Sequence, residues 1–193
     1  MVKVLVIKTS ALGDILQVYP CIREIKRVCP DAEIDWVIES SGHALARTHP
    51  LVKDVIDIHT KKWRRSPLHY FQEIRQFYNK LRSRHYDLLF DFQGNSKSAL
   101  IAWLARADVK VGFGKCASEW PARFVPDLKV DPRPGQNRRL DYLALVEAWS
   151  GKKAELELGT QLEISHNDER LVHEILSRKG AGKNMMVCPF KIG

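Results

Sequence analysis

Residues 1–20 read MVKVLVIKTSALGDILQVYP, which is the pattern of a strand, a glycine-containing loop and a helix. Residues 2–7 are rich in β-branched apolar side chains, as a strand buried on both faces requires. From Ile15 to Cys29 the apolar residues return with helical spacing. Ligands of open parallel sheets bind at the carboxyl ends of the strands. We therefore expect the loop at residues 8–14 to form part of a ligand site.

The rest of the chain repeats this alternation of short apolar strands and amphipathic helices. It predicts a Rossmann-like α/β fold, with a parallel sheet and helices on both faces. Residues 124–137 read as an irregular connection because Pro126, Pro132 and Pro134 interrupt them. The expected strands are residues 34–38, 54–58, 86–92, 109–113 and 185–188, and the expected helices are residues 43–48, 67–84 (with Ser66 as its N-cap), 96–106, 138–150 and 166–178.

Asp14 is the most informative residue of the first loop, and two interpretations of it stand side by side. Its position at the start of a helix suits an N-cap carboxylate that accepts backbone N–H groups. The same position, at the mouth of a parallel strand, suits a catalytic carboxylate. The loop contains neither G-x-G-x-x-G nor G-x-x-x-x-G-K-[ST], so dinucleotide and Walker-type phosphate sites are disfavoured.

A second loop follows the strand expected at residues 86–92. Gln93, Gly94 and Asn95 offer side-chain amides and backbone N–H groups that can hydrogen-bond a sugar. Lys97 has two interpretations, a surface helix residue or a partner for an anion. We expect this loop to lie beside the Asp14 loop, because both follow strands of one parallel sheet.

Basic residues concentrate between residues 61 and 84, which hold eight lysines and arginines and the single acid Glu73. One interpretation is a solvated helix face. However, we expect residues 61–65 to form a loop before the helix, where packing demands no cations. Arginine binds phosphate and carboxylate bidentately, which favours an anionic partner. Nucleic acid is not the expected partner, because no helix-turn-helix, RRM or zinc-finger signature is present.

Length and composition set broad limits. A chain of 193 residues holds one full α/β domain and a fragment of another. Its apolar content of 45% suits a globular core, and no apolar run has the length of a membrane span. The four cysteines lack metal-site spacing, which favours a reduced, cytoplasmic setting.

Three motifs resemble those of the bacterial lipopolysaccharide heptosyltransferases, most closely the type I enzymes of glycosyltransferase family 9. The first is KTSALGDIL at residues 8–16, followed by Tyr19 and Pro20. The second is YDLLFDFQGNSKS at residues 86–98, and the third is KKWRR at residues 61–65. They occur in the family's order and with similar intervals.

The resemblance implies an inverting enzyme of the GT-B class, which has two Rossmann-like domains across a cleft. Such enzymes transfer heptose from ADP-heptose to a Kdo sugar of lipid A. They use no cofactor or metal, since ADP-heptose is itself the donor substrate. By this resemblance Asp14 is the general base. The expected acceptor-binding residues are Lys8, Thr9, Ser10, Gly13, Lys61, Lys62, Arg64, Arg65, Gln93, Gly94, Asn95 and Lys97.

The implied organisation is an acceptor-binding domain at residues 1–151, a linker at 152–165 and the start of a truncated nucleotide-sugar domain at 166–193. We expect this chain to be inactive alone, as a fragment or a natural truncation. The implied partners are Kdo-lipid A, ADP-heptose through the missing domain, and the inner face of the inner membrane, where a cytoplasmic protein would bind peripherally. The alternative is a non-catalytic basic module that binds anionic glycolipid or a membrane surface.

Overall fold

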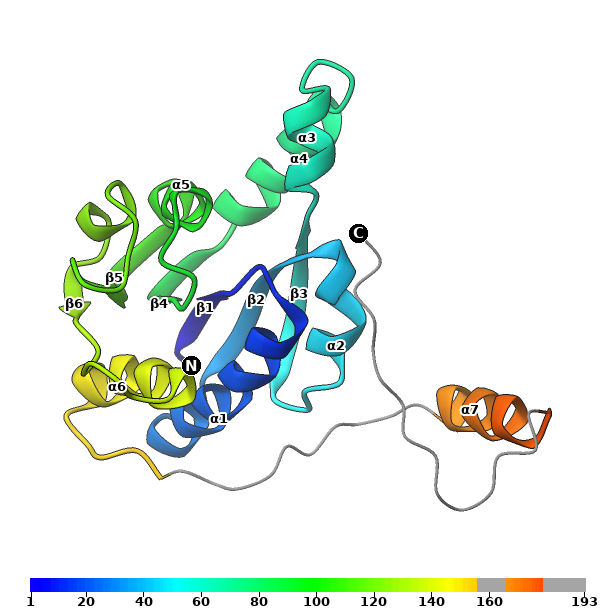
Figure 1. Ribbon diagram of the computed structural model, residues 1–193. Helices are drawn as coiled ribbons and strands as arrows, with labels where there is room; N and C mark the ends of the chain where they lie inside the picture. Colours follow the sequence, from blue (N-terminus) through cyan, green and yellow to red (C-terminus); the bar gives the residue numbers. More distant parts are fainter. Residues whose placement is uncertain (156–165, 179–193) are drawn as a thin grey trace. The chain divides into compact units, whose positions relative to one another are not determined.

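The computed structural model describes residues 1–155 and 166–178, and the chain divides into two compact units, Met1–Gln161 and Leu162–Gly193. The first unit is a six-stranded parallel sheet with the strand order β3-β2-β1-β4-β5-β6 (Figure 1). Its strands are β1 (Lys3–Ile7), β2 (Glu33–Glu39), β3 (Val52–Ile58), β4 (His85–Asp91), β5 (Arg106–Phe113) and β6 (Leu128–Val130). This confirms the predicted fold class.

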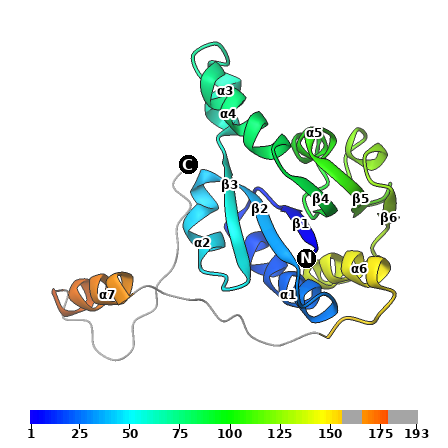
Figure 2. The same cartoon turned by 180° about the vertical axis from the view of Figure 1, so that it is seen from behind.

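Helices cover both faces of the sheet (Figures 1 and 2). One face packs under α1 (Leu12–Val28), α2 (His43–Arg47) and α6 (Arg138–Ser150), where Trp36, Tyr19 and Tyr142 are fully buried. The other face packs under α4 (Phe71–Arg82) and α5 (Ser96–Leu104), around Leu81, Leu89 and Ile101. α6 ends as expected at Gly151, whose φ of 67° places it in the left-handed region that glycine favours.

The second unit is described only at α7 (His166–Arg178), which the sequence predicted. The strand expected at residues 185–188 lies outside the described residues. The domain boundary at residue 151 and the linker at 152–165 stay predictions. Among residues 1–155 and 166–178, no helix is both long and apolar enough to cross a membrane.

The structure corrects the prediction for the basic run. Residues 61–65 are not a loop: they lie in a short helix, α3 (Thr60–Arg65). The Trp63 ring lies 5.4 Å from that of Phe77 and packs at the edge of the core, a contact that the local sequence does not indicate. This contact anchors α3 on α4, so tertiary packing replaces the caps that α3 lacks.

Other elements also differ from the expectations. The helix expected at residues 67–84 spans only Phe71–Arg82, and Ser66, the expected N-cap, instead ends α3, because the following Pro67 restricts it. α5 ends at Leu104 and β5 already begins at Arg106, because Arg106, Ala107 and Val109 pair with β4 although residues 106–109 are mostly exposed and form no apolar run. The connection at residues 124–137 contains β6, an edge strand too short for a clear periodic pattern.

Acid should destabilise the fold through His49, which packs against Tyr19 and is 2% exposed. Its Nε2 donates to the Tyr19 carbonyl, and its Nδ1 accepts from the Leu51 N–H, so the ring is neutral. Burial lowers the pKa of His49 to about 4. The unfolded state therefore binds a proton first as the pH falls below about 6.5, and stability is lost between there and about 4.

We expect the loss attributable to His49 to reach about 3 kcal/mol below pH 4. Urea unfolding at about pH 7.5 and pH 4.5 would measure it against His49→Gln, which keeps one donor and one acceptor but has no titrating ring. Other acidic groups titrate alike in both proteins. An identical pH dependence in the two proteins would show that His49 is not the cause.

Candidate active site

The first and second predicted loops meet at the carboxyl edge of the sheet, where β1 and β4 are neighbours. The Gln93 side chain connects them. Its Oε1 accepts from the backbone N–H of Thr9 at 3.1 Å and of Ser10 at 3.3 Å, and from the Thr9 hydroxyl at 3.3 Å. Gln93, in the second loop, therefore fixes the shape of the first loop, which leads to Asp14.

The second loop is held from beneath by Asp91, the last residue of β4. Its carboxylate accepts from the backbone N–H groups of Gln93 and Gly94 at 2.9 and 3.1 Å, and from the Ser98 hydroxyl at 2.8 Å. Gly94 has a φ of 68°, which favours glycine at this tight turn. Asn95 then caps α5 in a reciprocal capping box with Ser98. These contacts make the Gln93 turn rigid.

Asp14 lies in the first turn of α1, but it does not cap the helix. The N-cap position is Ala11, and no side chain caps α1. The Asp14 carboxylate instead lies 3.4 Å from the Nζ of Lys8, and its side chain remains 43% exposed. The structure thus leaves the capping interpretation without support. An open carboxylate at the strand mouth is the arrangement that a general base requires.

Lys8 is the buried partner of this pair, with 3% of its side chain exposed. Burial lowers the pKa of Lys8, and the charges of Asp14 and Asp91 offset part of that effect. Its ammonium also lies 5.1 Å from the centre of the Tyr142 ring on α6. The Lys8 side chain therefore sits beneath Asp14, away from solvent, where it orients the carboxylate.

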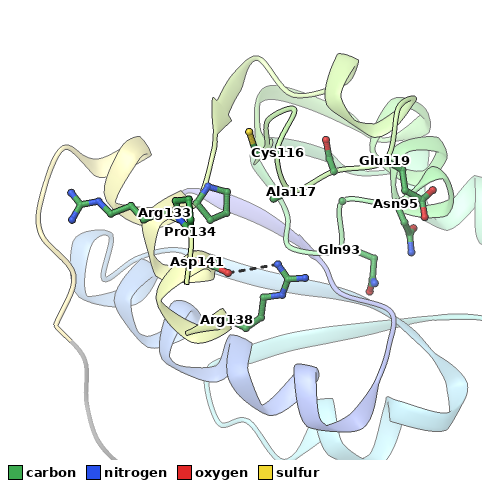
Figure 3. A pocket seen from close by; sticks show the side chains of 12 residues that line it. Gln93, Asn95, Cys116, Ala117, Glu119, Arg133, Pro134, Arg138 and Asp141 are labelled. Atoms are coloured by element: carbon green, nitrogen blue, oxygen red, sulfur yellow. Dashed lines mark ion pairs between the residues drawn. The ribbon is translucent and has the colours of Figure 1, made fainter. Parts of the chain in front are cut away.

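A polar cavity of about 720 Å³ opens at the Gln93 turn (Figure 3). Its walls come from the Gln93 turn, from the segments at residues 116–119 and 132–134, and from the start of α6. Arg138 and Asp141 reach from α6 toward the Gln93 loop, and their charged groups lie 3.6 Å apart. The Asp141 carboxylate is 9% exposed, and its Oδ1 has no hydrogen-bond partner among the described residues. That oxygen is itself buried, although Asp141 lines the cavity.

Comparison with known protein families identifies the family of this chain. Residues 74–189 match the family model "Glycosyltransferase family 9 (heptosyltransferase)". The chain belongs to glycosyltransferase family 9. It is 36% identical to lipopolysaccharide heptosyltransferase 1 of Pseudomonas aeruginosa over 106 residues, which cover 54% of this chain and 29% of that protein. It is 26% identical to the Campylobacter coli enzyme of that name, over 92% of this chain and 50% of that one.

Solved structures show the same likeness. Escherichia coli heptosyltransferase WaaC with ADP superposes with a TM-score of 0.76 at 26% identity, over 82% of this chain and 51% of that one. A family 9 glycosyltransferase from Veillonella parvula, at 17% identity, shares the fold with a TM-score of 0.75. The chain spans about half of each of these structures and about a third of the first curated relatives that it matches.

Within this family 9 fold, most of the predicted site residues do come together. One group forms the paired loops at the carboxyl edge, namely Lys8, Thr9, Ser10, Gly13, Asp14, Gln93, Gly94 and Asn95. No neighbouring atom lies within 4 Å of the place where a Cβ on Gly13 would be, so the space beside Asp14 is open. The predicted loops are thus one site.

Lys97 and the basic residues form a second group further along the same edge. The Lys97 ammonium lies 3.0 Å from Glu39 at the end of β2 and 3.2 Å from the Thr60 hydroxyl at the start of α3. It therefore already has an anionic partner. Lys61, Lys62, Arg64 and Arg65 are exposed on α3, and within residues 1–155 and 166–178 they form no ion pair.

Sequence reasoning missed the far wall of the cavity, including Arg138, Asp141 and Glu119. Glu119 accepts from the backbone N–H of Ser96 at 2.7 Å and so closes the cavity beside α5. The available signal was that residues 114–137 follow the strand expected at residues 109–113 and lead into the helix expected at residues 138–150. Among the described residues, no three histidine, cysteine or acidic side chains cluster as a metal would require.

Proposed function

We propose that this chain is the acceptor-binding part of an inverting heptosyltransferase, which transfers heptose from ADP-heptose to a Kdo sugar of the lipopolysaccharide inner core. The observation that carries the proposal is the open Asp14 carboxylate, held by buried Lys8 on a loop that Gln93, a residue of the cavity wall, fixes in place. Family membership supports the reaction class. The ADP-heptose site would lie in a part of the enzyme beyond this domain.

In the proposed reaction, an acceptor hydroxyl attacks the anomeric carbon of the heptose and Asp14 takes the hydroxyl proton. The new bond joins the acceptor oxygen to the anomeric carbon. The bond between that carbon and the ADP oxygen breaks on the opposite face, which inverts the configuration, and ADP leaves with the electron pair. Lys8 holds the carboxylate in place through its ion pair.

The cavity would hold the acceptor sugar. Arg138, which lines the cavity, can meet a sugar carboxylate. The exposed cations of α3 would bind further acceptor anions, such as lipid A phosphates. A lipid-linked acceptor places the enzyme at the inner face of the inner membrane, as a cytoplasmic protein that binds the membrane peripherally.

A titration with a soluble, deacylated Kdo–lipid A saccharide tests this proposal, with ADP titrated in parallel. We expect low-micromolar binding of the saccharide and none of ADP. Failure of the saccharide to bind would reject the acceptor site. Binding of intact glycolipid without the saccharide would favour the non-catalytic membrane-binding alternative.

The basic helix should contribute to that affinity. We expect Arg64→Gln/Arg65→Gln to weaken saccharide binding by about tenfold and to reduce its salt dependence, because each lost charge removes roughly 0.5–1 kcal/mol. Lys152→Gln/Lys153→Gln removes the same charge from an exposed site after α6 and should change little. Equal weakening in both pairs would mean that only net charge matters.

A further inference from the structure

Large apolar side chains are exposed on the sheet face that α4 and α5 cover. Leu100 and Trp103 are 57% and 68% exposed on the outer side of α5. Trp120 and Phe124, beside the short helix η2 (Ala122–Phe124), are 69% and 61% exposed. We call these four residues the α5–η2 patch.

The α5–η2 patch rests on elements that are packed against the core. The inner side of α5 buries Ala99, Ile101 and Ala102 in the core, so both sides of this helix are apolar. η2 packs against α5, and the Trp120 and Phe124 rings meet edge to face at 5.6 Å. A helix that is apolar all round normally has a cover on both sides. Within residues 1–155 of the first unit, no element shields the outer side of the patch.

Two arginines lie at the edges of the patch, and the exposed acid Glu119 directly precedes Trp120. The Arg123 guanidinium lies 4.9 Å from the centre of the Phe124 ring. Arg82 reaches from α4 to the last turn of α5, where it donates to the Leu104 carbonyl. The exposed cations of α3 follow on the same face, beside α4, whose Phe71 is 60% exposed (Figures 1 and 2).

From this arrangement we propose that the α5–η2 patch docks onto a lipid bilayer with anionic headgroups. Tryptophan favours the bilayer interface, and lysines and arginines near the surface are attracted to an anionic leaflet. A covering protein segment would bury the apolar groups equally well, but it would give no reason for the neighbouring cations. Charge complementarity therefore selects the bilayer.

The patch also adjoins the candidate active site, and this part of the inference rests on the proposed function. Cys116, Ala117, Ser118 and Glu119 line the cavity, and Trp120 follows directly in the chain. An amphiphilic acceptor could keep its acyl chains in the bilayer under Trp120 while its sugar enters the cavity. The docked orientation would thus align the cavity with a lipid-linked sugar.

Flotation with vesicles of phosphatidylethanolamine and phosphatidylglycerol, free of glycolipid, tests the docking. We expect the 193-residue chain to float with these vesicles at low salt and not with phosphatidylcholine vesicles. Trp103→Ser/Phe124→Ser should weaken the vesicle affinity by about tenfold or more, through lost apolar insertion. Leu171→Ser/Val172→Ser removes two exposed apolar side chains from α7 and should bind as the parent does.

The outcome of the flotation experiment decides for or against the docking proposal. No flotation of the parent chain, or equal flotation of Trp103→Ser/Phe124→Ser, would overturn the proposal. Circular dichroism would check that the variant is folded, which its exposed positions favour. Saccharide binding should be unchanged in this variant, so loss of vesicle binding with intact saccharide binding supports the patch. Vesicle binding without saccharide binding by the parent would reject the acceptor site and keep the patch.

Discussion

Asp14→Asn is expected to lower the rate of heptose transfer by about 10²–10⁴-fold, the usual contribution of a general base. Asparagine keeps the size and one acceptor oxygen of the side chain, so it can still meet the Lys8 ammonium, but it cannot take a proton. The reaction needs a donor site, so the assay uses this chain fused to the half of Escherichia coli WaaC that it does not match. The fusion without the substitution sets the reference rate.

Binding separates a catalytic role from a structural one. The Asp14→Asn chain should bind the Kdo-containing saccharide about as well as the parent, because the change affects the rate and not the cavity. Asp31→Asn removes an exposed carboxylate that pairs with the N-terminus and should leave transfer intact. Should the Asp14→Asn fusion keep more than a few per cent of the reference rate, Asp14 would be a positioning group rather than the base.

The fold could be predicted because its main signals are local. The apolar strands at residues 2–7 and 86–92 are buried on both faces, and such strands stand out in a sequence. α3 could not be predicted in this way. Its stability depends on Trp63 meeting Phe77, and no local pattern in a run of lysines and arginines reveals that contact. The edge strand β6 was not predicted for a similar reason, since three residues are too few to show an alternation of polar and apolar side chains.

The candidate site was predictable where it depends on topology. Loops after β1 and β4 must be neighbours once the sheet is parallel, and the Gln93 bonds to Thr9 and Ser10 show that they are. The partners of single charges were not predictable. Lys97 reads as a free cation in the sequence, yet Glu39, 58 residues away, pairs with it. Arg138 and Asp141 reach the cavity only because α6 packs beside α1.

The second large expected effect is a loss of stability when the support of the Gln93 turn is removed. Asp91→Ala should destabilise the protein by about 3–5 kcal/mol, because the carboxylate is buried and satisfies three donors at once. Burial raises the pKa of Asp91, while hydrogen bonds from Gly94, Ser98 and Gln93 and the charge of Lys8 oppose the rise. Alanine would leave those donors without an acceptor. Urea unfolding would measure the loss.

Asp91→Asn is the matched comparison for this substitution. Its Oδ1 can still accept from the Gln93 and Gly94 N–H groups, and its amide can donate to the Ser98 hydroxyl, so we expect a cost about 2 kcal/mol smaller than for alanine. If Asp91→Ala and Asp91→Asn were destabilised equally, the negative charge near Lys8 would matter and the hydrogen bonds would not. If neither variant were destabilised, the Gln93 turn would owe its shape to the Asn95 capping box alone. In that case Asp91→Ala should also leave saccharide binding unchanged, since Gln93 would still hold the Asp14 loop in position.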